Sequence, residues 1–378
     1  MRKISFSGID LQLNEIKKEL EPSIFKTIES GKYILGPEVE KLETKLSNFC
    51  KSKFTITCAN GTDAITLALM ALDFKPNDFI VTPGFGFVST VESPTQLGVK
   101  PIFVDINYNN FSINVEELKN IIVKAKKNNI SIKGLITADL FGMPANYLEL
   151  LEVCKENKLL WINDAAQSFG SKFQNKSITL YSDVTTTSFF PSKPLGCYGD
   201  GGCTFTENKD WAARIKALRV HGKGDNKYDN IYVGLNSRLD SIQATILLEK
   251  LKLFKIETKR RNEIADFYLK NLCSLVELPQ KQKNKYSVWS QFTIRTKRRN
   301  SLKEYLKNKK IPTMIYYPKP IHKQKAYHKF YSFKNSLQNC IKASKEVLSI
   351  PIHGYLCDEQ AAFIVETINS FFKKNESI

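Results

Sequence analysis

The feature that most constrains this chain is a regular alternation of short apolar runs and helix-like stretches from about residue 37 to 205. Such alternation is typical of an α/β domain, in which helices cover a mostly parallel sheet. Glycine and proline residues separate the runs and indicate the turns between them. The runs predict strands over residues 54–58, 79–82, 101–104, 135–137, 159–162 and 184–187.

Helical segments lie on both sides of these runs. Pro37 is expected to open a helix, because proline fits the first turn of a helix. A longer helix is expected over about 237–269, and beyond residue 275 the pattern changes to a lysine-rich α+β segment. We therefore expect a large domain over residues 1–250 and a smaller C-terminal α+β domain over 251–378. The N-terminal helix is a candidate addition to the small domain.

Composition excludes several classes of protein. Of the 378 residues 42% are hydrophobic and 25% are charged, which fits a globular enzyme with a large core. The chain start lacks the apolar stretch of a signal peptide and no run approaches a membrane span, so we expect a cytoplasmic protein without a membrane partner. Eight cysteines without a Cys-x-x-Cys pair, and only four histidines, argue against a metal site or a disulfide framework. The net charge of +18 comes largely from lysines spread along the chain, so we expect no nucleic-acid partner.

The first candidate site is a phosphate cradle. Gly61, Thr62 and Asp63 stand where a predicted strand ends and a predicted helix begins. Free backbone N–H groups and the helix dipole favour a phosphate at such a place, and Gly61 permits its close approach. An ordinary capped helix start fits the same residues, so this motif alone decides little.

The second candidate is a carboxylate at the end of a buried strand. Asn163 and Asp164 directly follow the apolar run LLWI. A carboxylate there needs a cationic or hydrogen-bonding partner, because its burial is otherwise costly. A protonated pyridine nitrogen would be such a partner, and Gln167 would be placed to bond the 3-hydroxyl of the same ring. A helix N-cap is the alternative role for Asp164.

The third candidate is the strongest, and it is a lysine in the segment TSFFPSKPLG. Lys193 precedes a proline, which predicts an extended backbone, and its neighbours are small or apolar. Such a lysine loses hydration, which lowers its amine pKa and makes imine formation with an aldehyde feasible. Ser188 can donate its hydroxyl to a phosphate. A lone lysine is normally an exposed charge, but the preceding strand and the glycines of GDGG at 199–202 favour a buried one.

The fourth candidate is the segment GLNSRLD before the long predicted helix. Asn236 and Arg238 can present an amide and a guanidinium to an anion. A capped helix start with Arg238 in a surface ion pair is the alternative.

Together the four segments resemble the DegT/StrS-type nucleotide-sugar aminotransferases, a branch of the fold-type I pyridoxal-phosphate (PLP) enzymes. The similarity runs from about residue 33 to the C-terminal region, with the motifs in the family's order and spacing. The resemblance implies a large domain with a mostly parallel central sheet flanked by helices, plus a smaller C-terminal α+β domain. It also implies PLP as the cofactor and a homodimer with shared active sites.

The resemblance implies a role for each matching residue. Lys193 would hold PLP covalently and shuttle a proton, Asp164 would pair with the pyridine nitrogen, and Gln167 with the ring hydroxyl. Phe87 would stack on the cofactor ring. The remaining residues would hold the phosphate (Gly61, Thr62, Asp63 and Ser188), reach across the dimer interface (Asn236 and Arg238) or bind substrate (Arg238, Tyr316 and Tyr317).

The resemblance also bears on the substrate. Dehydratase relatives replace the lysine with histidine, so Lys193 implies transamination, with L-glutamate as amino donor. The motifs look most like those of enzymes acting on 3-keto sugars, and a dTDP-linked 3-keto-6-deoxyhexose is our first expectation. The alternative is a UDP-linked 3-keto-N-acetylhexosamine or its uronic acid, although Tyr316 replaces the histidine of uronate-type relatives. Other departures are Asn163, Gly86 and Met143, where Glu, Thr and Gln are usual.

The product of such an enzyme would feed a surface polysaccharide, such as the O-antigen of lipopolysaccharide, or a glycoprotein glycan. A PLP-fold protein that regulates without catalysis is the main alternative in another functional class.

Overall fold

The computed structural model describes residues 3–226, 228–330, 333 and 337–373. Its centre is a seven-stranded sheet with the strand order β1-β9-β8-β5-β4-β2-β3. β9 runs antiparallel to β1 and β8, and the remaining neighbours pair in parallel, which confirms the expected mostly parallel sheet. The strands are β1 (Phe54–Cys58), β2 (Phe79–Pro83), β3 (Lys100–Val104), β4 (Ile132–Ala138), β5 (Leu160–Asp164), β8 (Val184–Ser188) and β9 (Gly202–Thr206).

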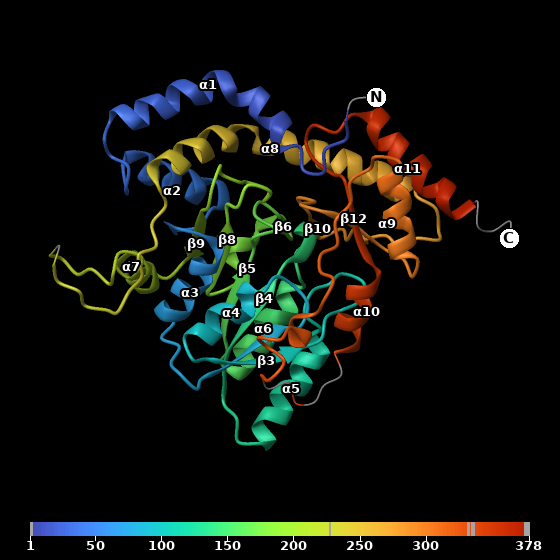
Figure 1. Cartoon of the computed structure of the whole chain (residues 1–378). Helices are drawn as coiled ribbons and strands as arrows, with labels where there is room; N and C mark the ends of the chain where they lie inside the picture. The colour runs from blue at the N-terminus through green and yellow to red at the C-terminus, as the bar shows by residue number, and fades with distance from the viewer. Residues whose placement is uncertain (1–2, 227, 331–332, 334–336, 374–378) are drawn as a thin grey trace.

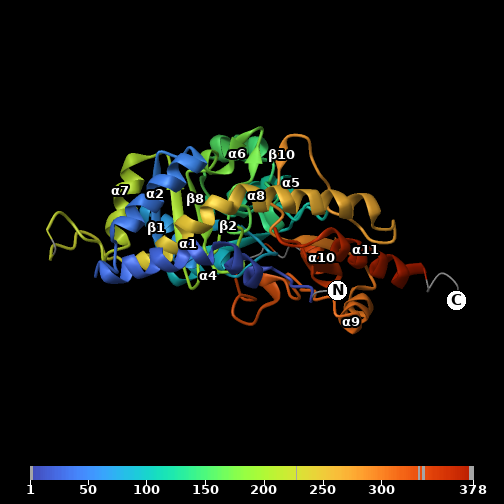
Figure 2. The same cartoon turned by 90° about the horizontal axis from the view of Figure 1, so that it is seen from above.

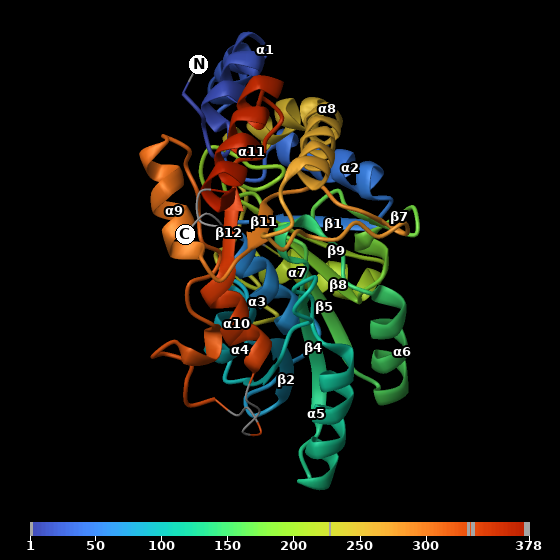
Figure 3. The same cartoon turned by 90° about the vertical axis from the view of Figure 1, so that its right-hand side faces the viewer.

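Helices cover both faces of this sheet, because successive residues of a strand point to opposite sides. Ile80 packs in a core cluster with α3 and α7, while its neighbour Val81 packs in another cluster with α5 and α6. Figure 3 shows α4 on one side of the strands and α6 on the other. The helices are α2 (Pro37–Cys50), α3 (Gly61–Ala71), α4 (Ser89–Gln96), α5 (Val115–Lys127), α6 (Tyr147–Asn157) and α7 (Lys209–Leu218).

Two long helices cross the top of the molecule in Figure 1: α1 (Ile9–Glu29) and α8 (Ser241–Asn271). They pack against each other through a small cluster that includes Ile16, Leu20 and Ile246. α8 runs uninterrupted through residue 250, the predicted domain boundary. Its first half packs with the large sheet through Leu247 and its second half with the C-terminal segment through Ile264. The division into domains therefore stays a prediction, with α8 common to both parts.

The C-terminal segment forms its own small α+β layer beside the large sheet (Figure 2). β11 and β12 pair antiparallel, and helices pack around them in the largest core cluster, which also takes in Ile4 from the chain start. The C-terminal segment also pairs with the large domain in a three-stranded sheet of order β10-β6-β7. The elements are β6 (Lys172–Phe173), β7 (Lys176–Ser177), β10 (Lys285–Tyr286), β11 (Phe292–Arg295), α9 (Arg299–Asn308), α10 (Gln338–Glu346), β12 (Val347–Ile350) and α11 (Asp358–Lys373).

The strand register gathers the predicted site residues at one edge of the sheet. Asp164 ends β5, Ser188 ends β8, and Gly61 follows the end of β1. Gly202 of β9 pairs with both Ser188 and Cys58, so the ends of β8 and β1 lie in one row. The carboxyl edge of a parallel sheet is where ligands bind in open α/β folds.

Two features are absent from the described residues. Among the described residues, no helix combines the length and apolar character that crossing a membrane requires. Nor do those residues include three or more histidine, cysteine or acidic side chains grouped to hold a metal ion.

Close to this edge an ion pair joins Arg219, the residue that follows α7, to Glu43 of α2, and a hydrogen bond joins Arg219 to β1. The Nη1 atom of Arg219 lies 2.6 Å from Oε1 of Glu43 and 2.7 Å from the backbone oxygen of Thr57. We predict that Arg219→Met lowers the free energy of unfolding by about 3 kcal/mol, because it leaves the Glu43 carboxylate, whose side chain is only 15% exposed, without its cation. In contrast, Lys119→Met, which breaks an exposed pair with Glu116, should cause no measurable loss. Urea unfolding of both variants checks this, and equal losses would contradict it.

Candidate active site

A cavity of about 410 Å³ opens at the carboxyl edge of the sheet. Most of the sequence-predicted site residues line it, although they come from distant parts of the chain. The lining residues predicted from the sequence are Gly61, Thr62, Phe87, Asp164, Gln167, Ser188, Lys193, Tyr316 and Tyr317.

One end of the cavity is built to receive a phosphate. α3 begins at Gly61, and the first N–H groups of a helix have no partner within the helix. A Cβ atom added to Gly61 would lie 2.6 Å from Cβ of Ser188, so only glycine allows these two segments to meet. Asn60 caps the helix by accepting a hydrogen bond from the backbone N–H of Asp63 at 2.8 Å. Asp63 itself is not among the lining residues, so its predicted phosphate contact gains no support from its position.

Lys193 and Asp164 bring opposite charges to the same cavity. Phe190 to Lys193 form a turn, in which the backbone N–H of Lys193 donates to the Phe190 oxygen at 2.9 Å. Burial lowers the pKa of the Lys193 amine, and the nearby Asp164 carboxylate acts in the opposite direction. Burial raises the pKa of Asp164, while a hydrogen bond from the Ala166 N–H and the charge of Lys193 lower it.

The opposite wall is formed by polar and aromatic side chains whose orientation is fixed. Gln167 accepts a hydrogen bond from the Phe141 N–H at 2.6 Å and donates one to the Tyr317 hydroxyl at 2.9 Å. The half-exposed ring of Phe87 lies 6.4 Å from the Tyr317 ring. An aromatic ring and an amide thus line the same cavity, and both are groups that a flat heteroaromatic ring can contact.

Asn236, Arg238 and Met143 lie away from this cavity. Asn236 is exposed and forms an isolated β-bridge with Val220. Neither Asn236 nor the partly buried Arg238 lines the cavity of its own chain. Met143 packs against the C-terminal core cluster rather than into the cavity.

Several lining residues were missed by the sequence analysis, among them Asn60, Asp139, Asp200 and Gln291. Asn60 directly precedes the phosphate motif, so its capping role was recognisable. Gln291 directly precedes β11, in a segment where no motif marks a site. Asp139 follows the apolar run of β4, and that position is the same signal that identified Asp164.

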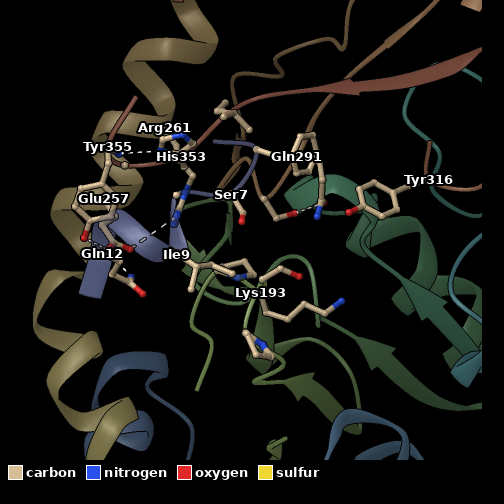
Figure 4. A pocket seen from close by; sticks show the side chains of 18 residues that line it. Ser7, Ile9, Gln12, Lys193, Glu257, Arg261, Gln291, Tyr316, His353 and Tyr355 are labelled. Carbon is tan, nitrogen blue, oxygen red and sulfur yellow. Dashed lines mark hydrogen bonds and ion pairs between the residues drawn. The ribbon is translucent and has the colours of Figure 1, made fainter. Parts of the chain in front are cut away.

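A smaller polar pocket of about 50 Å³ lies behind the Lys193 loop (Figure 4). Oε1 of Glu257 accepts hydrogen bonds from Nε2 of Gln12 at 2.6 Å and from the Tyr355 hydroxyl at 2.5 Å. Figure 4 shows this network on the side of the loop away from the Lys193 amine. It ties α1, α8 and the C-terminal segment together across the pocket from the lysine loop.

These features fit pyridoxal phosphate. The helix start beside Gly61 and Ser188 suits its phosphate, the Asp164 carboxylate suits a protonated ring nitrogen, and the Lys193 amine suits an aldehyde.

The interaction between the Asp164 carboxylate and the Lys193 amine can be tested through the pKa of Lys193. Removing the negative charge with Asp164→Asn should lower the pKa of Lys193 further, because that charge favours the protonated amine. In cofactor-free protein, the midpoint pH for acylation of Lys193, followed by mass spectrometry, should therefore move down. Exposed lysines in the same digest are the internal control. An unchanged or higher midpoint would show that the two groups do not interact.

Comparison with known proteins places this geometry in a family. Residues 14–369 match the DegT/DnrJ/EryC1/StrS aminotransferase family. The chain is 39% identical to a UDP-2-acetamido-2-deoxy-3-oxo-D-glucuronate aminotransferase of Pseudomonas aeruginosa, covering 93% of this chain and 96% of that protein. It is 33% identical to a dTDP-3-amino-3,6-dideoxy-alpha-D-galactopyranose transaminase of Aneurinibacillus thermoaerophilus, covering 94% and 96%.

Solved structures agree with the sequence relatives. A DegT DnrJ EryC1 StrS aminotransferase from Brucella abortus superposes with a TM-score of 0.96 at 37% identity, covering 97% of this chain and 99% of that one. NtdA from Bacillus subtilis, solved with bound cofactor PMP, gives a TM-score of 0.90 at 27% identity, covering 99% and 86%. The chain therefore belongs to the DegT/DnrJ/EryC1/StrS aminotransferase family and is a PLP-dependent enzyme.

Proposed function

We propose that this aminotransferase moves an amino group from L-glutamate to the 3-keto carbon of a nucleotide-linked sugar. The observation that carries the reaction type is the meeting of the Lys193 amine and the Asp164 carboxylate in one cavity with the helix start at Gly61. The position of the keto group rests on the two relatives, whose names both place the reaction at carbon 3 of the sugar.

The roles of the chain's own residues follow from their environment. When bound, PLP supplies an electron sink that makes a C–H bond beside nitrogen acidic. Lys193 would hold the cofactor through its amine and then carry the proton between the two carbon atoms, because burial lowers the pKa of the amine and so eases the release of its proton. Asp164 would keep the ring nitrogen protonated, and Gln167 would orient the ring hydroxyl. Gly61, Thr62 and Ser188 would hold the phosphate.

The identity of the nucleotide is the open part of the proposal. The sequence motifs favoured a dTDP-linked 3-keto-6-deoxyhexose, while the relative with 39% identity acts on a UDP-linked 3-oxo-glucuronate. The dTDP relative is 33% identical over a similar length. We therefore propose the 3-keto sugar as substrate class and give the UDP-linked and dTDP-linked forms equal weight. In either case the amino sugar would be used in a surface glycan.

A homodimer is part of the proposal, because the single chain leaves apolar side chains in water. Ile231 and Val233 are 56% and 92% exposed on the segment between α7 and α8, and Phe190 is 52% exposed at the cavity. A second copy would cover such a surface. We propose that Asn236 and Arg238, on this same segment, complete the partner's cavity.

The reaction is tested with a panel of dTDP- and UDP-linked 3-keto and 4-keto sugars, each supplied with glutamate. We expect glutamate-dependent amination of at least one 3-keto sugar and at least 100-fold lower kcat/KM for its 4-keto isomer, about 3 kcal/mol of discrimination. Lys193→Ala should abolish turnover. Turnover of 4-keto sugars alone would contradict the proposed regiochemistry, and wild-type turnover by Lys193→Ala would contradict the role of the lysine.

The shared active site is tested by mixing two inactive variants, Lys193→Ala and Arg238→Ala. In a mixed dimer one cavity carries both substitutions and the other carries neither. After exchange of subunits about half of the dimers are mixed, so activity should return to roughly a quarter of the wild-type value. Mixtures that stay as inactive as the separate variants, although subunit exchange is shown by mass spectrometry, would contradict the shared site.

A further inference from the structure

A second buried carboxylate, Asp139, lies beside the proposed cofactor residues at the end of β4. Its side chain is 1% exposed, and it also lines the cavity. Oδ1 accepts a hydrogen bond from the Ala145 N–H at 2.9 Å. Oδ2 faces the amide of Asn163 at 3.1 Å, the hydroxyl of Ser168 at 3.0 Å and the hydroxyl of Tyr147.

The chemistry of these partners suits a carboxyl group that accepts hydrogen bonds. The Ala145 N–H and the Asn163 amide can only donate, and a carboxylate without its proton accepts from all four groups. Burial raises the pKa of Asp139, whereas the hydrogen bonds lower it. The contacts of this carboxyl group are hydrogen bonds from one backbone N–H and three side chains.

The hydrogen bonds of this carboxylate connect two segments that carry the proposed cofactor contacts. Asn163 precedes Asp164 in the chain, and Ser168 follows Gln167. Two backbone groups strengthen the connection. The Asp139 N–H donates to the backbone oxygen of Asp164 at 3.1 Å, and the Phe141 N–H donates to Oε1 of Gln167 at 2.6 Å. The turn after β4 is therefore joined to the turn after β5 on both sides of the two residues.

The third side chain that bonds Asp139 is Tyr147, whose own position is fixed by packing. Tyr147 is fully buried at the start of α6, and its ring packs against Trp161 and Tyr181 with centroid distances of 5.5 and 5.0 Å. Its hydroxyl also accepts a hydrogen bond from the Asn163 amide at 3.1 Å.

We propose that Asp139 is a positioning residue, which holds Asp164 and Gln167 at the cofactor through the hydrogen bonds it accepts from Asn163 and Ser168. This inference rests on the proposed contacts of Asp164 and Gln167. Asn163 suits this role of Asp139 because its amide donates a hydrogen bond, whereas an acidic residue at position 163 would place a second negative charge against Asp139.

The test measures how fast the cofactor leaves the holoenzyme, together with steady-state kinetics. Asp139→Asn places an amide N–H₂ donor where the Ala145, Asn163, Ser168 and Tyr147 groups need an acceptor. We therefore expect PLP to dissociate about tenfold faster and kcat to fall about tenfold, which corresponds to the loss of about one buried hydrogen bond. KM for glutamate should stay within about threefold, because Asp139 is not proposed to touch the amino donor. Ser168→Ala should change PLP dissociation and kcat in the same direction but less, and it replaces Asp139→Asn as the test variant if that protein fails to fold.

A rescue experiment separates positioning from general stability. Asn163→Asp alone should weaken cofactor retention as Asp139→Asn does, whereas the double variant Asp139→Asn with Asn163→Asp should recover much of it. In the double variant the carboxylate at position 163 can accept from the hydroxyls of Thr137 and Tyr147, which already lie at 2.7 and 3.1 Å from the Asn163 side chain.

The matched control is Tyr268→Phe, which removes the buried hydrogen bond from its hydroxyl to the Pro351 backbone oxygen at 2.9 Å, in the C-terminal core and not at the cavity. It should lower the melting temperature and leave PLP dissociation unchanged. The inference is overturned if Asp139→Asn and Ser168→Ala retain PLP as the control does, or if the double variant is no better than the single ones. If Asp164→Asn also retains PLP normally, it is the proposed cofactor contact that fails.

Discussion

The electrostatic interaction between the Lys193 amine and the Asp164 carboxylate is the constraint on which the rest of the site depends. Each group is buried at the carboxyl edge of the sheet, and each favours the charged form of the other. Isolated charges in such a place are costly, so a fold that keeps both must provide partners for them. The helix start at Gly61 and the turn after β8 are arranged around this pair, and a cofactor with an aldehyde, a basic ring nitrogen and a phosphate satisfies all three features.

Local signals in the sequence predicted much of this arrangement. The apolar runs identified the strands of the large sheet except β9, because each buried strand is a short uninterrupted run between turn residues. Asp164 and Lys193 were found because a charged residue directly after such a run, or between small and apolar neighbours, is unusual. Gly61 was found because a glycine at a strand-to-helix junction permits close approach of a ligand.

The rest depends on contacts between residues that are far apart in the chain. Asp139 meets Asn163 and Ser168 across 24 and 29 residues, and only the pairing of β4 with β5 brings them together. Gln291 reaches the cavity from the C-terminal segment, whose sequence carries no motif for it. The continuity of α8 across residue 250 likewise reflects packing against two core clusters, which residue order alone does not reveal.

The most direct measurement of the central claim is to reduce the PLP-loaded protein with borohydride and locate the cofactor by peptide mass spectrometry. Reduction fixes a cofactor bound through an amine to that amine permanently. Attachment to Lys193 alone, lost in Lys193→Ala, is the predicted result. Attachment to another lysine of the 378-residue chain, or a protein that absorbs as a PLP enzyme but carries no label at Lys193, would contradict the claim.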